Sequence, residues 1–213
     1  MPITPAAASQ AAEEICRLAP VVPVLIVSDV ATARPLAEAL VAGGLPALEV
    51  TLRTPVALEV IREMASVPGG KVGAGTLLTP DDVAKAKDAG ATFGVSPGAT
   101  DRLLDAAEEI GLPLLAGAAT ATEAMALLER GYTVQKFFPA EASGGAKALG
   151  SLASPLPQIR FCPTGGIGLN NAKDYLGLAN TLCVGGSWVA PKDKIEAGDW
   201  AGIEALAREA AAL

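Results

Sequence analysis

The sequence has no histidine among its 213 residues. This absence excludes a histidine general base, a catalytic triad that contains histidine, and metal sites built on imidazole. Aromatic residues are also scarce, at 4% of the chain, so aliphatic side chains must form the core. A chain dominated by alanine, valine and leucine is typical of buried parallel strands covered by helices.

Cysteines are few and show no grouping typical of a metal site. Cys16, Cys162 and Cys183 are widely spaced, without the short intervals that mark metal-ligating cysteines. An odd number of distant cysteines fits a reducing compartment, and two of the three lie in apolar, strand-like runs. We therefore expect core residues there, and neither a metal nor another cofactor.

Basic clusters and long apolar runs are missing as well. The net charge of −7 argues against a nucleic-acid partner or an anionic membrane surface. No apolar run is long enough to span a bilayer, and no signal peptide is visible, so we expect a cytoplasmic protein. A phosphorylated substrate remains compatible with this charge, because backbone N–H groups can hold phosphate.

Strand-like apolar runs alternate with helical segments along the whole chain. Eight strand–helix units predict an α/β protein whose parallel strands close into a single (β/α)8 barrel. An extra N-terminal helix, capped by Ser9 and ending near Leu18, would cover one end. No linker divides residues 1–213, so we expect one domain, with residues 1–8 loose. The expected strands cover 21–27, 47–52, 72–75, 92–96, 113–116, 133–138, 158–163 and 182–185.

Lys136 stands at the end of an apolar strand, beside Phe137 and Phe138 and just before Pro139. Desolvation disfavours an ammonium group, and a neutral amine can attack a ketone to form a Schiff base. The alternative is a lysine that packs its stem and extends its head group to water.

Glu49 lies inside another predicted strand. Strand alternation puts Glu49 and Thr51 on one face, and helices cover the outer face, so an inward Glu49 would be a carboxylate in the barrel mouth. It could then move protons for the amine. The alternative is a structural ion pair, for example with Arg53.

Arg53 and Thr76 follow the second and third predicted strands. The guanidinium of Arg53 could bind a substrate carboxylate with two hydrogen bonds, and Thr76 could add a hydroxyl. A surface arginine and a helix or turn cap are the alternatives.

Two glycine pairs end the last two predicted strands, Gly165-Gly166 and Gly185-Gly186, the latter followed by Ser187. In many barrels the loops after strands seven and eight bind phosphate against backbone amides. Together, the amine, the carboxylate, the arginine and this cradle predict a substrate that is a 2-keto acid with a distant phosphate.

Six sequence blocks carry a specific resemblance that extends from about Leu18 to the C-terminus. They are LEVTLRT at 48–54, VGAGT at 72–76, VSPG at 95–98, KFFPAE at 136–141, RFCPTGGI at 160–167 and CVGGSW at 183–188. As a set they resemble the class I aldolases that cleave 2-keto-3-deoxy-6-phosphogluconate (KDPG) and often also 4-hydroxy-2-oxoglutarate (KHG).

The resemblance implies a lyase of the Entner–Doudoroff pathway that converts KDPG to pyruvate and glyceraldehyde 3-phosphate without a metal. It also implies activity on KHG, with pyruvate and glyoxylate as products, and a homotrimer of barrels. The implied roles are Schiff base for Lys136, proton shuttle for Glu49, carboxylate binding for Arg53 and Thr76, pocket walls for Pro97, Phe138 and Thr164, and phosphate binding for Gly165, Gly166, Gly185, Gly186 and Ser187.

Two positions depart from the family pattern. Ala116 stands where the family usually has a proline before the glycine, which is Gly117 here, and this change would loosen the loop after strand five. Gln135 replaces a more apolar residue before the lysine, and alternation places it on the face toward the helices.

Two other functions fit the same residues. A phosphosugar isomerase or decarboxylase could use Glu49 and Lys136 as acid and base without an imine, and a catalytically silent binding or assembly protein could keep the fold alone. The second leaves unexplained why an amine and a carboxylate share the barrel mouth.

Overall fold

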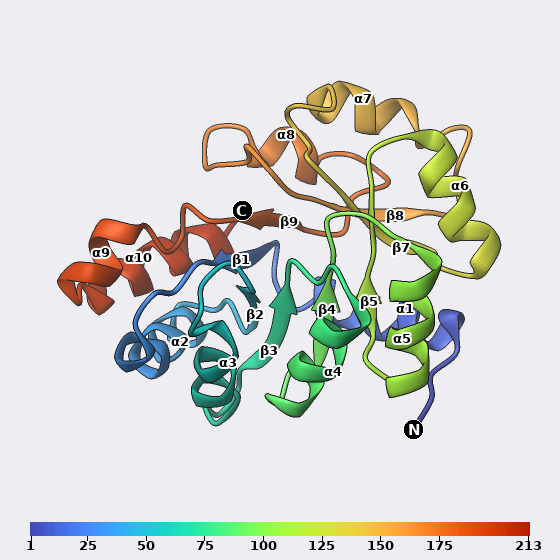
Figure 1. The fold of residues 1–213 in the computed structure, drawn as a ribbon. Coiled ribbons are helices and arrows are strands. Elements are labelled where there is room, and N and C mark those ends of the chain that lie inside the picture. The colour runs from blue at the N-terminus through green and yellow to red at the C-terminus, as the bar shows by residue number, and fades with distance from the viewer.

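The computed structural model describes residues 1–213 and has an α/β fold in which helices cover a curled parallel sheet (Figure 1). All pairings between the named strands are parallel, as expected when each strand is followed by a helical crossover. The strands are β1 (Val21–Leu25), β2 (Ala47–Thr51), β3 (Lys71–Gly75), β4 (Phe93–Val95), β5 (Leu114–Leu115), β6 (Gly117–Ala118), β7 (Val134–Phe137), β8 (Arg160–Pro163) and β9 (Val184–Gly186).

The helices surround the strands on the outside, with α2 to α5 on one side and α6 to α8 on the other (Figure 1). They are α1 (Pro5–Cys16), α2 (Ala33–Ala42), α3 (Ala57–Ala65), α4 (Pro80–Asp88), α5 (Asp101–Ile110), α6 (Ala121–Arg130), α7 (Gly145–Ser151), α8 (Ala172–Leu176), α9 (Lys192–Ala197) and α10 (Trp200–Ala211), with a 3-10 turn η1 (Val30–Thr32) before α2. None of these helices is long and apolar enough to cross a membrane.

The strands form two ladders rather than the single eight-stranded ladder that was expected. One has the order β5-β4-β3-β2-β1-β9 and the other the order β6-β7-β8. The fifth expected strand is interrupted at Ala116, whose carbonyl accepts a hydrogen bond from the Lys136 amide at 2.9 Å. Between β8 and the chain around β9, two isolated parallel bridges, Phe161 to Thr181 and Thr164 to Gly185, replace a regular ladder.

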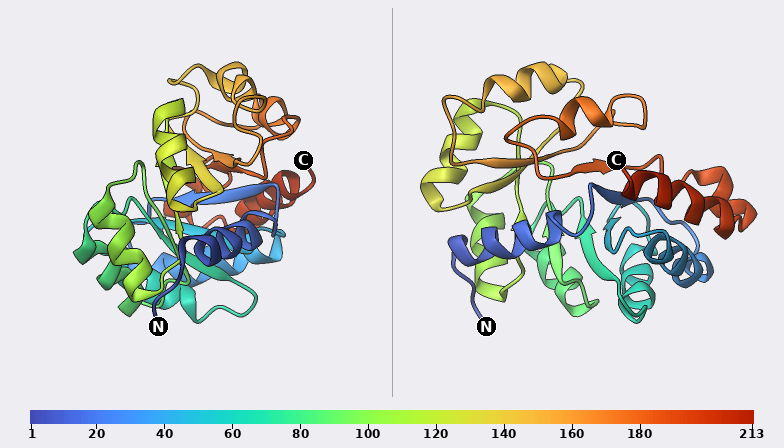
Figure 2. Two further views of the ribbon diagram at one scale, coloured as in Figure 1. Left: turned by 90° about the vertical axis from the view of Figure 1, so that its right-hand side faces the viewer. Right: turned by 180° about the vertical axis from the view of Figure 1, so that it is seen from behind.

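Two apolar clusters explain why this fold is stable. The larger packs the helices onto the outer faces of the strands. The smaller combines inward residues of several strands with Ala12 and Cys16 of α1, which therefore covers one end of the sheet (Figure 2). All positions of β1 and β2 are buried, as expected for strands that have helices outside and side chains packed within.

The first helix begins earlier than predicted, so the expectation of a loose segment is wrong for residues 5–8. Thr4 caps α1 by accepting a hydrogen bond from the Ala7 amide, and Pro5 occupies the first turn, where its missing N–H costs nothing. Ser9 is not the cap. Its Oγ is buried and accepts a hydrogen bond from the Thr133 amide at 2.8 Å, which fastens α1 to the start of β7.

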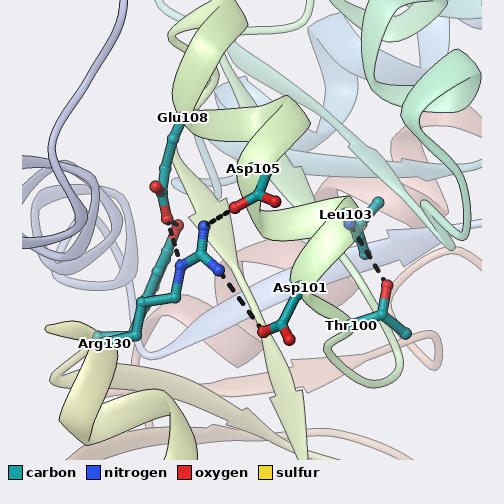
Figure 3. Close-up of polar contacts among 7 residues, drawn as sticks. Thr100, Asp101, Leu103, Asp105, Glu108 and Arg130 are labelled. Carbon is teal, nitrogen blue, oxygen red and sulfur yellow. Dashed lines mark hydrogen bonds and ion pairs between the residues drawn. The ribbon is translucent and has the colours of Figure 1, made fainter.

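Arg130, the last residue of α6, joins this helix to α5. Its guanidinium contacts Asp105 and lies 2.8 Å from Glu108 and 3.6 Å from Asp101 (Figure 3). Gly111 and Gly131, at the C-termini of these two helices, have positive φ, which glycine adopts without steric cost. Charge pairing between neighbouring helices thus supplements their apolar packing.

Candidate active site

The neighbourhood of Lys136 and Glu49 is the centre of the candidate site. Lys136 comes from β7 and Glu49 from β2, and each residue is 3% exposed. The lysine Nζ donates a hydrogen bond to Oε1 of Glu49 at 3.3 Å across 87 positions of sequence. The structure therefore brings the two residues together inside the sheet, and Arg53 is not the partner of Glu49.

Small neighbours make room for this pair. Gly75 ends β3, directly beside β2, and a Cβ added to it would overlap the carboxylate of Glu49. The ring of Phe138, two residues after Lys136, has its centre 5.2 Å from Nζ of Lys136. An amine this far from water needs a partner or must lose its charge, and Glu49 can meet either need by pairing or by accepting the proton.

Arg53 and Thr76 meet beyond the ends of β2 and β3. The Arg53 Nε donates to Oγ1 of Thr76 at 3.0 Å. Thr76 has φ of +63°, the only positive value among the non-glycine residues, and a β-branched residue there is strained. The strained backbone places the threonine hydroxyl against an exposed guanidinium, an arrangement suited to holding an anion.

The predicted phosphate residues lie at the ends of β8 and β9. Gly165 and Gly166 have φ of +104° and +77°, so side chains there would strain the turn. A Cβ on Gly185 would overlap the Thr164 side chain, which is buried. Ser187 follows at an exposed position.

Glu141 and Tyr175 support this loop, a contribution that sequence reasoning missed. The Tyr175 hydroxyl donates to Oε1 of Glu141, whose own amide donates to the carbonyl of Gly165 at 3.1 Å. Burial, followed by the adjacent carboxylate of Glu141, raises the pKa of Tyr175. Glu141 belongs to the KFFPAE block, but nothing in the sequence points to a tyrosine 34 positions further on.

Pro97 follows β4, and its carbonyl lies so close to Gly117 that a Cβ at Gly117 would overlap it. The departure at Ala116 lies at the break between β5, which ends at Leu115, and β6, which begins at Gly117. Gln135 faces the helices as predicted, since its side-chain amide donates to the carbonyls of Ala124 and Tyr132 at 3.0 and 2.9 Å.

A cavity of about 670 Å³ opens beside the β9 end of the site. Val24, Ile26, Ser28, Asp29, Thr32, Ser187, Trp188, Ala190, Pro191, Lys192, Ile195 and Glu196 line it. Of the predicted site residues only Ser187 borders this cavity, while the Lys136–Glu49 pair lies deeper between the strands. The cavity is therefore an extension beside the predicted phosphate end.

The three cysteines are all buried, and the structure brings them together. Their Sγ atoms all lie within 4.8 Å of one another. The expectation of core residues is confirmed, but the sequence spacing gave no sign of a cluster, because one member comes from α1, one from β8 and one from the residue directly before β9.

The chain matches the family model described as KDPG and KHG aldolase over residues 12–206. It is 52% identical to the 2-dehydro-3-deoxy-phosphogluconate aldolase of Dickeya dadantii over 94% of this chain and 95% of that protein. The crystal structure of the KDPG aldolase of Zymomonas mobilis ZM4 with 3-phosphoglycerate superposes with a TM-score of 0.92, at 52% identity over 96% of each chain.

The KDPG aldolase of Legionella pneumophila, crystallised with pyruvate captured as a covalent carbinolamine, is 42% identical, with a TM-score of 0.91 over 93% of this chain and 97% of that one. Fold and sequence together define a carbon–carbon lyase of the aldolase class. Within that class, the chain belongs to the KDPG and KHG aldolase family.

Proposed function

We propose that this chain cleaves KDPG to pyruvate and glyceraldehyde 3-phosphate, as a step of the Entner–Doudoroff pathway, through a Schiff base on Lys136. The observation that carries the proposal is the buried contact of 3.3 Å between Nζ of Lys136 and Oε1 of Glu49. A paired amine and carboxylate away from water can exchange one proton directly, so the amine becomes nucleophilic while the site stays neutral overall.

The first half of the reaction builds the imine. Lys136 passes a proton to Glu49, and its free amine attacks C2 of the keto acid to give a carbinolamine. Glu49 returns a proton to the C2 oxygen, which leaves as water, and an iminium ion remains. The positive nitrogen now withdraws electrons from the neighbouring carbons, which is what covalent catalysis by an amine supplies.

The second half breaks the carbon–carbon bond. Glu49, or a water that it orients, takes the proton of the C4 hydroxyl, the C3–C4 electrons move to form an enamine, and the aldehyde departs. The enamine is protonated at C3, and one water hydrolyses the resulting iminium to pyruvate and the ammonium form of Lys136. One water is lost and one regained, and no metal is required.

The surrounding residues hold the two ends of the substrate. Arg53 and Thr76 bind the carboxylate, supported by their contact at 3.0 Å and the strained Thr76 backbone. Pro97, Phe138 and Thr164 form the pocket walls, and Thr164 flanks the nascent aldehyde. Phosphate is bound by backbone N–H groups at a set of close-packed residues, Gly165, Gly166, Gly185, Gly186 and Ser187.

The same site acts on KHG, giving pyruvate and glyoxylate, because both substrates share the 2-keto acid that Lys136 and Arg53 engage. Measuring pyruvate release from the phosphorylated and unphosphorylated keto acids side by side tests this extension. Equal specificity constants for both would contradict a role of the glycine loops in phosphate binding.

We also propose that residues 1–213 form one domain, with the two ladders closing into a (β/α)8 barrel through the bridges between β8 and β9. In the cell the protein is a cytoplasmic homotrimer. Family membership supports this assembly, and sedimentation of the purified chain at several concentrations tests it.

Borohydride trapping tests the imine. With pyruvate present, reduction should attach a three-carbon acid to the peptide that contains Lys136. Lys136→Ala should lose both the adduct and turnover, whereas the control Lys147→Ala, at an exposed lysine, should keep both. An unlabelled Lys136 in an active enzyme would exclude the imine and favour acid–base chemistry.

A further inference from the structure

The cysteine cluster lies outside the chemistry described so far. Cys16 is the last residue of α1, Cys162 lies in β8, and Cys183 directly precedes β9. The three residues are 1%, 2% and 0% exposed, and their sulfurs are within 4.8 Å of one another. Three sulfurs so close together can supply all the ligands of a three-coordinate ion.

The surroundings of the cluster are apolar and uncharged overall. The cysteines belong to the smaller apolar cluster, with aliphatic residues and Phe93 as their neighbours. Lys136 stands opposite Cys162 in the register of β7 and β8, but its charge is already paired with Glu49. A net charge created at the sulfurs would therefore have no free partner, and burying it would be costly.

We propose that Cys16, Cys162 and Cys183 form a binding site for trivalent arsenic, a soft ion that takes three thiolate ligands. Arsenous acid, As(OH)3, exchanges each hydroxyl for a sulfur. The proton of each of the three thiols leaves with one hydroxyl as water. Three arsenic–sulfur bonds replace three arsenic–oxygen bonds, and no oxidant or reductant takes part.

Charge and coordination number distinguish this ion from other thiophilic ones. Zn²⁺ takes four ligands in structural sites, and with three thiolates it would leave a net charge of −1 and an empty position. Monovalent copper would leave a net charge of −2. Trivalent arsenic gives a neutral adduct with no missing ligand, so of these three ions it is the one that avoids an unpaired charge among apolar residues.

Binding requires the three sulfurs, now within 4.8 Å of one another, to move closer together. Three bonds of about 2.3 Å, the length of a zinc–thiolate bond, arranged as a trigonal pyramid place the sulfurs about 3.5 Å from one another.

The ion must enter by local opening, because the sulfurs are closed off from solvent. Cys16 ends α1, and the following Arg17 and Leu18 are exposed, so fraying of this helix end provides a route. We therefore expect slow binding. In the empty site, Sγ of Cys162 lies 4.0 Å from Oγ1 of Thr164, a proposed wall of the substrate pocket. Arsenic would draw Cys162 toward α1 and disturb this contact, so turnover should fall as arsenic binds.

Native mass spectrometry of the full-length reduced chain with arsenous acid tests the proposal. We expect one arsenic per chain, loss of three titratable thiols on subsequent unfolding, and reversal of the activity loss by a small dithiol. Cys16→Ala should keep its basal turnover and bind arsenic at least tenfold more weakly, because only two sulfurs remain. Cys183→Ala provides the same comparison if the first variant fails to fold.

Three results would overturn the site. These are no adduct on the folded wild-type chain, an adduct of equal affinity in both cysteine variants, or stoichiometric zinc that arsenous acid fails to displace. The phenyl derivative of arsenous acid can bind only two sulfurs, so its affinity for the wild type should exceed that for the variants by no more than about threefold, the ratio of available sulfur pairs. A loss of affinity for this probe in the variants as large as that for arsenous acid would also contradict three-point binding.

Discussion

At the scale of the residue, the buried amine of Lys136 needs a partner for its charge, and Glu49 supplies it. Lys136 and Glu49 are each 3% exposed and share one hydrogen bond. Removing either partner leaves the other as an isolated buried group, which costs several kcal/mol if it keeps its charge. The pair is therefore structural and, by our proposal, chemical at once, so a test must separate the two contributions.

Glu49→Gln separates them, because the amide preserves the shape of the side chain and still accepts a hydrogen bond from Lys136. It cannot take up a proton, so kcat for pyruvate release should fall by roughly 10² to 10⁴. A coupled pyruvate assay measures the loss, with Glu59→Gln, at an exposed position of α3, as the matched control. Wild-type kcat in Glu49→Gln would remove Glu49 from proton transfer.

At the scale of the element, α6 shows how local chemistry starts a helix. Oε2 of Glu123 accepts hydrogen bonds from the amides of Ala119 and Thr120 and from the Thr120 hydroxyl, each at 2.9 Å. The amide of Glu123 donates to Oγ1 of Thr120, which completes a capping box. The bond from Ala119, followed by those from Thr120, lowers the pKa of Glu123.

The capping box makes the stability of α6 depend on pH. Because the folded-state pKa of Glu123 is lowered, its contribution is complete above the ordinary glutamate pKa and is lost as pH falls through the folded-state value. We expect Glu123→Gln to be about 0.5 kcal/mol less stable than wild type at pH 7, with the difference vanishing in acid. Urea unfolding across this pH range, with Glu129→Gln as control, measures it. A difference that persists at low pH would contradict the ionic origin.

Arg130 joins α5 to α6, so its removal should lower the free energy of unfolding more than the removal of an isolated surface charge. Its side chain is 22% exposed and is surrounded by Asp101, Asp105 and Glu108 (Figure 3). Without the guanidinium these carboxylates repel one another and Glu108 keeps only its bond from Tyr132.

Arg130→Ala should lower the free energy of unfolding by about 1 to 3 kcal/mol, measured by urea titration. The control Arg208→Ala removes an i,i+4 pair with Glu204 within one helix and should change it by about 0.5 kcal/mol or less. Equal effects of the two substitutions would show that the α5–α6 contact adds nothing beyond a surface ion pair.

At the scale of the whole molecule, the main question is how the two ladders join. The Phe161 amide donates to the Asn180 carbonyl at 2.8 Å, and the Leu182 amide donates to the Phe161 carbonyl at 2.9 Å. If the barrel is closed, these amides should exchange as slowly as that of Leu52, which donates to Gly75 beside β2 and β3. Hydrogen exchange followed by NMR measures the three rates, and rapid exchange of Phe161 and Leu182 alone would indicate an open seam.

Much of the fold and the centre of the site were predictable from sequence for a physical reason. Parallel strands buried on both faces appear as apolar runs, so Lys136 and Glu49 stand out as charges that such runs rarely contain. The side of the sheet that carries the candidate site was predictable too, because parallel strands joined by helices all have their C-terminal ends on the same side. The start of α1 was missed because it depends on a single cap, Thr4. Several strand ends were missed as well, and so was the short helix α9, which has no side-chain cap.

Contacts between distant segments were not predictable from one sequence. The support of the Gly165 loop by Tyr175 through Glu141 and the meeting of three cysteines both need elements that the chain order keeps apart. The positive φ of Thr76 was not predictable either, because β-branched residues rarely adopt it. A strand register sets which inward side chains share a layer, and the register is decided by packing of the whole sheet.

The sequence by itself determined the alternation of strands and helices and the residue types available for chemistry, because these follow from local apolar patterns and from composition. Only the tertiary structure decided that Glu49 is the partner of Lys136, that Arg53 pairs with Thr76, and that Cys16 reaches Cys162 and Cys183. Those contacts join segments far apart in the chain, and their geometry is set by how the curled sheet and α1 pack together.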